Sequence, residues 1–255
     1  MLEFARSLPA MRAVWHEHLQ RSDLSYERVL ACAARLLDRG FFRIGTEGYA
    51  EQNQTYGLAT IQKRHVHLAE NFLTFDYVAK SGKRRIQSIV DPEVYEVVTQ
   101  LKRRRSGPSD LLAFKDGRRW IDVRSSDIND YIRDIAQDDF TAKDFRTWGA
   151  TVLAAVGVSV SGEAAKSKTA RKRAITRAVQ EVAHYLGNTP AVCRASYIDP
   201  RVFDRYRSGW TIHPALEHIG SVNVFGEPST QGYIEEAVID LIEERRDSEA
   251  IDKIA

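Results

Sequence analysis

The sequence predicts an α+β fold: a predominantly α-helical domain with a small antiparallel β-sheet and hairpin insert. Apolar residues recur three and four positions apart over 25–40 and again over 142–156, which is the period of a helix. Between about 57 and 90 the pattern changes to short runs rich in β-branched and aromatic residues, which is typical of strands. A chain of 255 residues, 43% of them hydrophobic, can bury the core of one large domain or two small ones.

The first elements in chain order are a helix and the β insert. The helix over 25–40 presents one apolar stripe and stops at Gly40. Four short runs then indicate strands: LATI (58–61), HVHLA (65–69), FLTFDYVA (72–79) and RRIQSIV (84–90). A tight turn at 80–83 (KSGK) joins the last two. His65 and His67 alternate along the second run and so share a face, where two histidines without a third ligand favour solvent exposure over a metal site.

Helix start signals order the second half of the chain. An Asp-Pro pair at 91–92 opens one helix, an Asp-Gly pair at 116–117 predicts a hairpin, and the serines at 125–126 begin another helix. Thr141 followed three residues later by Asp144 has the spacing of a capping box, with Asp in place of the usual Glu. These signals predict a helix-rich segment interrupted by one hairpin.

Tyr197 lies between two short predicted helices. A long helix over 168–186 ends at Gly187. Thr-Pro at 189–190 and Asp-Pro at 199–200 each combine an N-cap with a proline at the first helical position. Tyr197 therefore ends one short helix just before the next, which we expect to be a mobile and exposed position.

Charge is distributed unevenly along the chain. The whole chain has 37 Lys and Arg against 35 Asp and Glu, of which residues 231–255 hold three basic and eight acidic side chains. Residues 1–230 therefore have 34 basic and 27 acidic side chains, a net charge of +7. Six Lys or Arg and no acid fall in 164–177, which reads either as a solvated helix face or as a surface for a phosphate-rich partner.

Several protein classes are disfavoured by the sequence. No apolar run approaches the roughly 20 residues that span a membrane, and charged residues interrupt the start where a signal peptide would lie. Cys32 and Cys193 make neither a disulfide framework nor a metal site, which fits a reducing cytosol. Because there is no carboxylate cluster and no Gly-rich phosphate loop, we expect no metal, no ATP and no other cofactor.

Two arginines stand out by their positions. Lys143 and Arg146 lie three apart at the start of a predicted helix, where the partial positive charge of the helix end favours anions over cations. A bound anion would explain them. Arg43 lies between apolar residues and Gly45, close to a loop. Each arginine alone could instead pair with a carboxylate in the core.

Four segments, in this order, resemble the catalytic domain of type IB DNA topoisomerases, most closely the poxviral and bacterial branch. They are FFRIGTEGYAEQNQTYGLATIQKRHV (41–66), YVAKSGK (77–83), KDFRTWG (143–149) and GNTPAVCRASYIDP (187–200). The resemblance implies a catalytic domain over 1–210, in the fold that this family shares with tyrosine recombinases, followed by an extension over 211–255. That extension contains an amphipathic acidic helix that could pack on the domain, bind a partner or shield the basic surface.

The resemblance also implies a role for individual residues. Arg43 and Arg146 match the two catalytic arginines, Lys80 the hairpin lysine that acts as general acid, and Tyr197 the nucleophile. The family commonly has a histidine nine residues before the tyrosine, where this chain has Asn188. An asparagine amide can donate a hydrogen bond to a non-bridging phosphate oxygen but cannot hold a proton. His184, one turn earlier, is the other candidate, and we prefer Asn188 because its spacing to the tyrosine is kept.

The implied reaction needs these residue types. A tyrosine has a pKa of about 10, and its attack on a phosphodiester adds charge to a group that is already anionic. Two guanidinium groups can bracket the non-bridging oxygens, and a lysine can protonate the leaving oxygen. Tyr197 would join the 3′ phosphate, a 5′ hydroxyl would leave, the free strand would rotate, and the hydroxyl would attack back to reseal the nick.

The resemblance gives double-stranded DNA as the partner of a monomer that works in the cytoplasm, on the nucleoid of a bacterial cell, without any membrane. Candidate DNA-binding residues are Tyr49, Lys143, Lys166, Lys168, Arg171, Lys172 and Arg173. Residues 164–177 would also form a mobile linker between the arginine helix and the tyrosine helix. The family's small N-terminal clamp domain would precede residue 1, so either the chain is an excised catalytic fragment or another chain supplies the clamp.

Two other functions stay open on the sequence. A tyrosine recombinase shares the fold and the nucleophile, but it usually carries H-x-x-R where this chain has Lys143-Asp-Phe-Arg146. A non-catalytic DNA-binding relative is the third reading. The presence of Arg43, Lys80, Arg146 and Tyr197 together argues against it, because a relative without activity has no chemical reason to keep all four.

Overall fold

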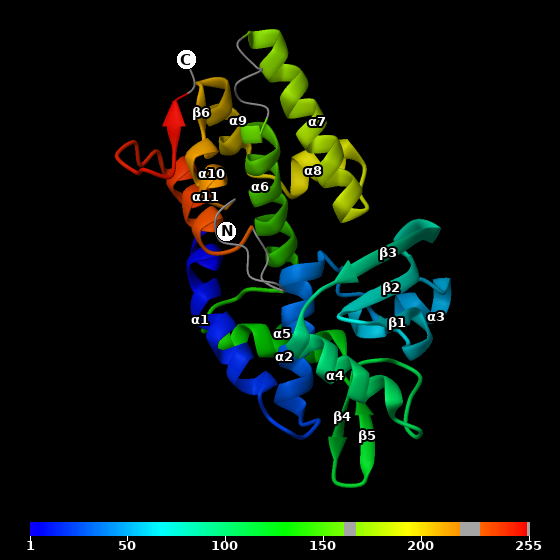
Figure 1. The fold of residues 1–255 in the computed structure, drawn as a ribbon. Coiled ribbons are helices and arrows are strands. Elements are labelled where there is room, and N and C mark those ends of the chain that lie inside the picture. Colours follow the sequence, from blue (N-terminus) through cyan, green and yellow to red (C-terminus); the bar gives the residue numbers. More distant parts are fainter. Residues whose placement is uncertain (161–166, 220–229, 254–255) are drawn as a thin grey trace. The chain divides into compact units, whose positions relative to one another are not determined.

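Helices and three small antiparallel sheets make up the computed structural model, which describes residues 1–160, 167–219 and 230–253 (Figure 1). The chain divides into two compact units, one formed by Ser7–Arg146 and the other by Met1–Arg6 with Thr147–Ala255. Two helices contribute residues to both units: α1 (Leu2–Leu19) and α6 (Ala142–Val160). No helix in the described ranges is long and apolar enough to cross a membrane.

The 7–146 unit combines helices with two sheets. Its further helices are α2 (Tyr26–Gly40), α3 (Glu47–Asn53), α4 (Pro92–Arg103) and α5 (Ser125–Ala136), with short 3₁₀ turns η1 (Leu58–Thr60), η2 (Lys63–His65) and η3 (Lys80–Gly82). Its strands are β1 (Val66–Ala69), β2 (Phe72–Ala79) and β3 (Lys83–Ile89) in one sheet, and β4 (Ala113–Asp116) with β5 (Arg119–Asp122) in a hairpin. The predicted α+β class, the hairpin at 116–117 and the helices that begin near 26, 92 and 125 are confirmed.

Helix α2 is largely buried, with both its apolar stripe and its small residues in the core. It ends at Gly40 as predicted, but the residue with left-handed backbone is Phe41 (φ 53°). Gly40 is needed for space, since a Cβ there would lie 2.3 Å from the Phe42 ring and 2.8 Å from the Ile89 side chain. The tight contact places the loop after α2 directly against the β insert.

The β insert differs from the prediction at its beginning. Residues 58–60 form η1 and not a strand, because Thr60 Oγ1 accepts a hydrogen bond from the Gly57 N–H (3.0 Å) and closes a local turn. His65 likewise ends η2, where its Nδ1 accepts from the Gln62 N–H (3.1 Å). His65 therefore lies outside β1, the strand that contains His67, and the two do not alternate along one strand. The remaining strands pair antiparallel in the order β1-β2-β3, with Leu73 opposite Ile89.

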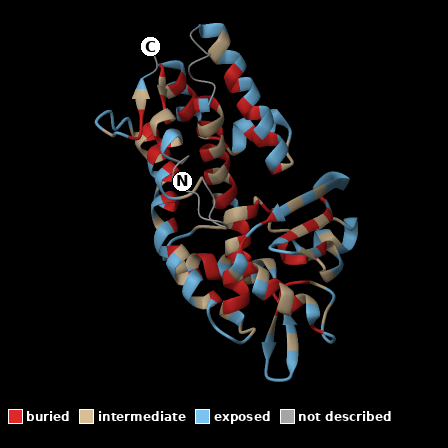
Figure 2. Ribbon diagram, viewed as in Figure 1, coloured by how far each residue is buried: buried red, intermediate tan, exposed pale blue. Residues whose placement is uncertain are grey.

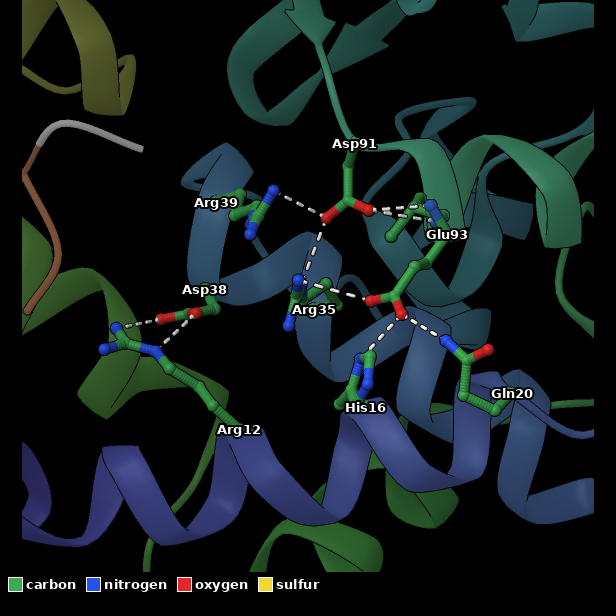
Figure 3. A network of polar contacts seen from close by, with 9 residues as sticks. Arg12, His16, Gln20, Arg35, Asp38, Arg39, Asp91 and Glu93 are labelled. Carbon is green, nitrogen blue, oxygen red and sulfur yellow. Dashed lines mark hydrogen bonds and ion pairs between the residues drawn. The ribbon is translucent and has the colours of Figure 1, made fainter. Parts of the chain in front are cut away.

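A buried carboxylate joins α2 to α4 (Figure 3). Asp91 is fully buried, and its Oδ1 caps α4 by accepting from the Glu93 and Val94 N–H groups, each at 3.1 Å. Its Oδ2 accepts from Arg35 Nε (3.0 Å) and lies 2.9 Å from an Arg39 terminal nitrogen. The sequence had indicated only the cap, so the ion pairs to α2 are a finding of the structure.

Asp91→Ala is expected to destabilise the 7–146 unit by about 3–5 kcal/mol, because it leaves two largely buried arginines without this carboxylate and also removes the cap. Asp91→Asn keeps a cap acceptor and should cost less. The measurement is urea unfolding followed by circular dichroism. Asp139→Ala is the matched control, because Asp139 is 92% exposed and its pair with Arg133 should contribute little. Equal midpoints for Asp91→Ala and this control would contradict the assignment.

The 147–255 unit is mainly helical. Besides the rest of α6 it contains α7 (Lys168–Leu186), α8 (Pro190–Ser196), α9 (Pro200–Arg207), α10 (His213–Ile219) and α11 (Tyr233–Glu243), with β6 (Trp210–Thr211) paired to β7 (Asp252–Lys253). Buried positions run along α6 and α11 in Figure 2. The caps predicted at Gly187, Thr189 and Asp199 are all present.

The acidic helix predicted near the C-terminal end is α11, and it packs on its own unit through contacts with α9 and α10. Its apolar face is buried, including Ile234, Val238 and Leu241. Glu235 is also buried and accepts a hydrogen bond from Trp148 Nε1 at 2.8 Å. Of the three roles left open for this helix, the structure therefore supports packing on the domain.

The basic run is helical over most of its length. Helix α7 begins at Lys168, where the Ser167 hydroxyl caps it by accepting from the Ala170 N–H (3.1 Å). A mobile linker over 164–177 is therefore wrong for residues 168–177, because a capped helix already includes them. Lys166 lies outside the described residues.

Candidate active site

The loop after α2 holds Arg43 through backbone contacts. The Leu58 N–H donates to the Arg43 carbonyl (2.8 Å), and the Ala59 N–H donates to the Ile44 carbonyl (2.8 Å). Gly45 has φ 73°, and a Cβ on it would lie 2.7 Å from the Gly57 Cα. Glycine at 45 and 57 lets the two chain segments touch, so the half-buried Arg43 side chain starts from a fixed backbone.

Arg146 is buried at the start of α6, with 4% of its surface exposed. Its guanidinium donates to the carbonyl of Phe41, two residues before Arg43. The helix start itself is capped as predicted, since the Thr141 N–H donates to Asp144 Oδ2 at 2.9 Å. Lys143 is exposed, so the two cations that were expected to share a helix face have different surroundings.

A third arginine joins these two around a buried phenol. Tyr77 on β2 is 4% exposed, and burial raises its pKa, while the charges of Arg85, Arg146 and Arg43 act in the opposite direction. Burial lowers the pKa of Arg85, and the Arg43 charge adds to that effect. We call Arg43, Arg85 and Arg146 the arginine cluster. Three guanidinium groups within electrostatic reach of one hydroxyl form a site suited to an anion.

Arg85 was not identified from the sequence, although a signal for it existed. The predicted turn at 80–83 pairs Ala79 with Lys83, and two further steps along the hairpin pair Tyr77 with Arg85. Applying that register would have placed Arg85 next to an inward-facing tyrosine.

Lys80 lies at the tip of the β2–β3 hairpin, as predicted. It opens η3, and Ser81 has a left-handed backbone (φ 66°). The Lys80 ammonium is exposed and lies 6.0 Å from the centroid of the Tyr49 ring on α3. The structure thus brings Lys80 together with one of the predicted DNA-binding residues, at the outer limit of a cation–π contact.

The segment around Tyr197 belongs to the 147–255 unit. The Tyr197 N–H donates to the Cys193 carbonyl (3.0 Å), which makes the tyrosine the C-cap of α8. Thr151 on α6 is fully buried, and its hydroxyl accepts from the Asp199 N–H (3.1 Å) and lies 3.4 Å from the Tyr197 carbonyl oxygen. Tyr197 is half-buried, so the exposed position expected for it is wrong: its own carbonyl and the chain that follows it contact α6.

Asn188 lies at the other end of α8. Gly187 (φ 65°) ends α7, and the Asn188 N–H donates to the Ala183 carbonyl at 2.9 Å. Asn188 is half-buried, whereas His184 is exposed on α7. Asn188 and Tyr197 therefore flank one short helix in the 147–255 unit, while Arg43, Lys80 and Arg146 belong to the 7–146 unit.

Lys168, Arg171, Lys172 and Arg173, four of the predicted DNA-binding residues of the basic run, lie on α7. Lys168, Arg171 and Lys172 line a cavity of about 400 Å³, together with Arg194 and Arg207, which sequence reasoning did not select. Arg173 is exposed and does not line this cavity.

Acidic residues gather elsewhere in the 7–146 unit. A cavity of about 970 Å³ is lined by both acidic and basic side chains, among them Asp110 and Asp122. Burial, together with the Asp122 charge, raises the pKa of Asp110 to about 6. Over the described ranges, no three His, Cys, Asp or Glu side chains converge in a way that could hold a metal ion.

Comparisons with known proteins identify the family of this chain. A family model described as eukaryotic DNA topoisomerase I, catalytic core, matches residues 1–212. The chain is 25% identical over 213 residues to DNA topoisomerase 1B of Acanthamoeba polyphaga mimivirus, which covers 82% of this chain and 63% of that relative. It is also 28% identical over 130 residues to DNA topoisomerase 1 of Daucus carota, covering 50% of this chain and 15% of the relative. The chain thus spans less than two thirds of the length of these relatives.

Proposed function

This chain belongs to the family of the DNA topoisomerase I catalytic core, and we propose that it acts as a type IB DNA topoisomerase. In this proposal it cleaves one strand of double-stranded DNA, lets that strand rotate and reseals it. The observation that supports the proposal most directly is the arginine cluster, in which Arg43 and Arg146, the two arginines matched by family motifs, both act electrostatically on the buried Tyr77 hydroxyl.

The proposed reaction starts from Tyr197. Its phenol gives up its proton to solvent as the oxygen forms a bond to the phosphorus of a phosphodiester, and the bond from phosphorus to the 5′ oxygen breaks. The Lys80 ammonium gives its proton to that leaving oxygen, which becomes a free 5′ hydroxyl. The strand stays joined to the protein as a 3′-phosphotyrosine until the hydroxyl attacks the phosphorus and displaces the tyrosine.

Charge stabilisation is the proposed work of the arginines. Negative charge grows on the non-bridging oxygens as tyrosine attacks, and fixed donors aimed at these oxygens are typically the largest catalytic contribution. Arg146 suits this role, because its buried guanidinium is already held against the Phe41 carbonyl. We propose Arg43 as the second donor. Asn188 adds a neutral amide donor in the position where the family commonly has histidine.

The cellular setting is proposed from the resemblance alone. We propose that the protein works as a monomer on the nucleoid in a bacterial cytoplasm, in the branch shared with poxviral enzymes. Exposed Tyr49 and Lys143, together with the basic residues of α7, would contact DNA, mostly at its phosphates. A clamp domain, in the same protein or on another chain, would bind the duplex together with this catalytic domain.

Relaxation of negatively supercoiled plasmid is expected to proceed in EDTA and without ATP. The chemical reason is that guanidinium groups neutralise the developing charge and Lys80 supplies the proton. The measurement is agarose-gel resolution of topoisomers over time, with and without added Mg²⁺. Complete dependence on a divalent ion would point to another class of enzyme. Relaxation of only those plasmids that carry one particular sequence would favour a site-specific tyrosine recombinase.

A further inference from the structure

A cavity in the 147–255 unit is lined almost entirely by cations. Its volume is about 400 Å³, within the range of small-ligand sites. Helices α7, α8 and α9, which pack together (Figure 1), contribute its lining: Lys168, Arg171, Lys172, Ile175, Thr176, Arg194 and Arg207. No carboxylate is among the described residues that line it, and of its five lining cations Arg207 also pairs with Asp204 at 2.6 Å.

The position of three of these cations is unfavourable without an anion. Lys168, Arg171 and Lys172 occupy the first two turns of α7, and the first turn has no acidic residue. The N-terminal end of a helix already has partial positive charge. Like charges three and four residues apart also repel each other on a helix surface. An anion bound in the cavity would relieve both effects.

Two of the lining arginines are held by contacts within the fold. An Arg171 terminal nitrogen donates to the Arg207 carbonyl at 2.9 Å, which ties α7 to the end of α9. The Arg194 guanidinium lies 5.3 Å from the centroid of the buried Phe203 ring. Ordered cations lose less conformational entropy when they bind a ligand than free surface side chains do.

We propose that this cavity binds one backbone phosphate of the DNA, other than the phosphodiester that Tyr197 attacks. The inference rests on the proposed function for the identity of its anion. Tyr197 does not line the cavity, but Arg194 lies three residues before it on the same short helix. A phosphate held by Arg194 from α8 and by the cations of α7 and α9 would therefore set the register of the DNA strand against the tyrosine.

The test combines variants of the cavity with DNA that lacks single charges. The protein carries Tyr197→Phe throughout, so that only binding is measured, by fluorescence anisotropy with a labelled duplex. The test variant adds Lys172→Ala and Arg207→Ala. The control adds Arg177→Ala, because Arg177 is exposed on the same helix and does not line the cavity. Duplexes with one uncharged methylphosphonate are compared position by position.

Two results are expected for the cavity variant. Its plot of log affinity against log salt should be shallower than that of the control by about 0.9, the value for one phosphate contact. If the two proteins converge at 1 M salt, this slope corresponds to an affinity about eightfold weaker at 0.1 M. One methylphosphonate position should weaken binding by the control but not by the cavity variant, which would identify the bound phosphate.

The outcomes separate this inference from the proposed function. Equal salt slopes for the two variants, or no methylphosphonate position that distinguishes them, would overturn the cavity as a phosphate site. If the wild-type protein relaxes plasmid in the same study, such a result contradicts only the phosphate site in the cavity and leaves the proposed function intact. If the expected differences appear but wild-type protein never relaxes plasmid, the cavity is supported and the proposed enzymatic activity is contradicted.

Discussion

Tyr197→Phe is expected to abolish both plasmid relaxation and the covalent protein–DNA adduct. The substitution removes one hydroxyl, which is the atom that would bond to phosphorus. Its effect on folding should be small, because the contacts that anchor this segment use the backbone N–H of Tyr197, the backbone N–H of Asp199 and the Thr151 hydroxyl. The affinity for DNA should stay within about twofold of the wild-type value, because most of that affinity comes from phosphate contacts and the substitution removes few of them.

The measurement is trapping of protein, by rapid denaturation, on a strand radiolabelled at its 5′ end, which belongs to the part that stays joined to the tyrosine. Mass spectrometry then identifies the linked peptide. Tyr185→Phe is the matched control, because Tyr185 is 57% exposed in the same unit and should keep full activity. Persisting relaxation by Tyr197→Phe would show that another residue is the nucleophile. Circular dichroism spectra of both variants, compared with that of the wild type, show whether each variant is folded.

Lys80→Ala is expected to cleave ordinary DNA at a rate about 100- to 10,000-fold below wild type, the usual range for loss of a general acid. A general acid matters only when the leaving group needs a proton. Replacing the 5′ bridging oxygen by sulfur creates a thiolate leaving group, which leaves without one. On the sulfur-substituted strand, Lys80→Ala should therefore cleave at close to the wild-type rate. Single-turnover cleavage on the two strands gives both rates.

Two comparisons make this result specific to Lys80. Lys83→Ala is the matched control, since Lys83 is an exposed lysine at the other end of the same hairpin turn. Asn188→Ala should be slow on both substrates, by about 10- to 1,000-fold, because a donor to non-bridging oxygens acts whatever the leaving group. Asn188→His restores the commoner family residue and should retain activity. Rescue of Asn188→Ala by sulfur, without rescue of Lys80→Ala, would reverse the two roles.

Elements whose limits depend on neighbouring residues were predictable from the sequence. The start of α4 follows from the side chain of Asp91, that of α6 from Thr141 with Asp144, and the end of α7 from Gly187. In each case the signal is a hydrogen bond or a backbone angle within a few residues of the helix end. The hairpin that presents Lys80 also follows from its turn residues. The family could be inferred too, because its motifs are short and lie in a fixed order.

Other features of the fold and the candidate site depend on residues far apart in the chain. Residues 58–60 have the composition of a strand, but their N–H groups bond to the loop around Arg43 and to a local turn, so no ladder forms. Arg85 and Arg146, 61 positions apart, meet near Tyr77 because a hairpin register and a helix start converge there.

The sequence by itself determined which side chains are available for the proposed reaction. These are the tyrosine, the arginines and the hairpin lysine, in the order in which the family has them. Only the tertiary structure decided their surroundings. It buried Arg146, left Lys143 exposed and joined Arg194 and Arg207 to the basic turns of α7. The physical reason is that burial and electrostatic proximity arise when distant segments pack, and neither charge pattern nor periodicity contains the distance between residues on different elements.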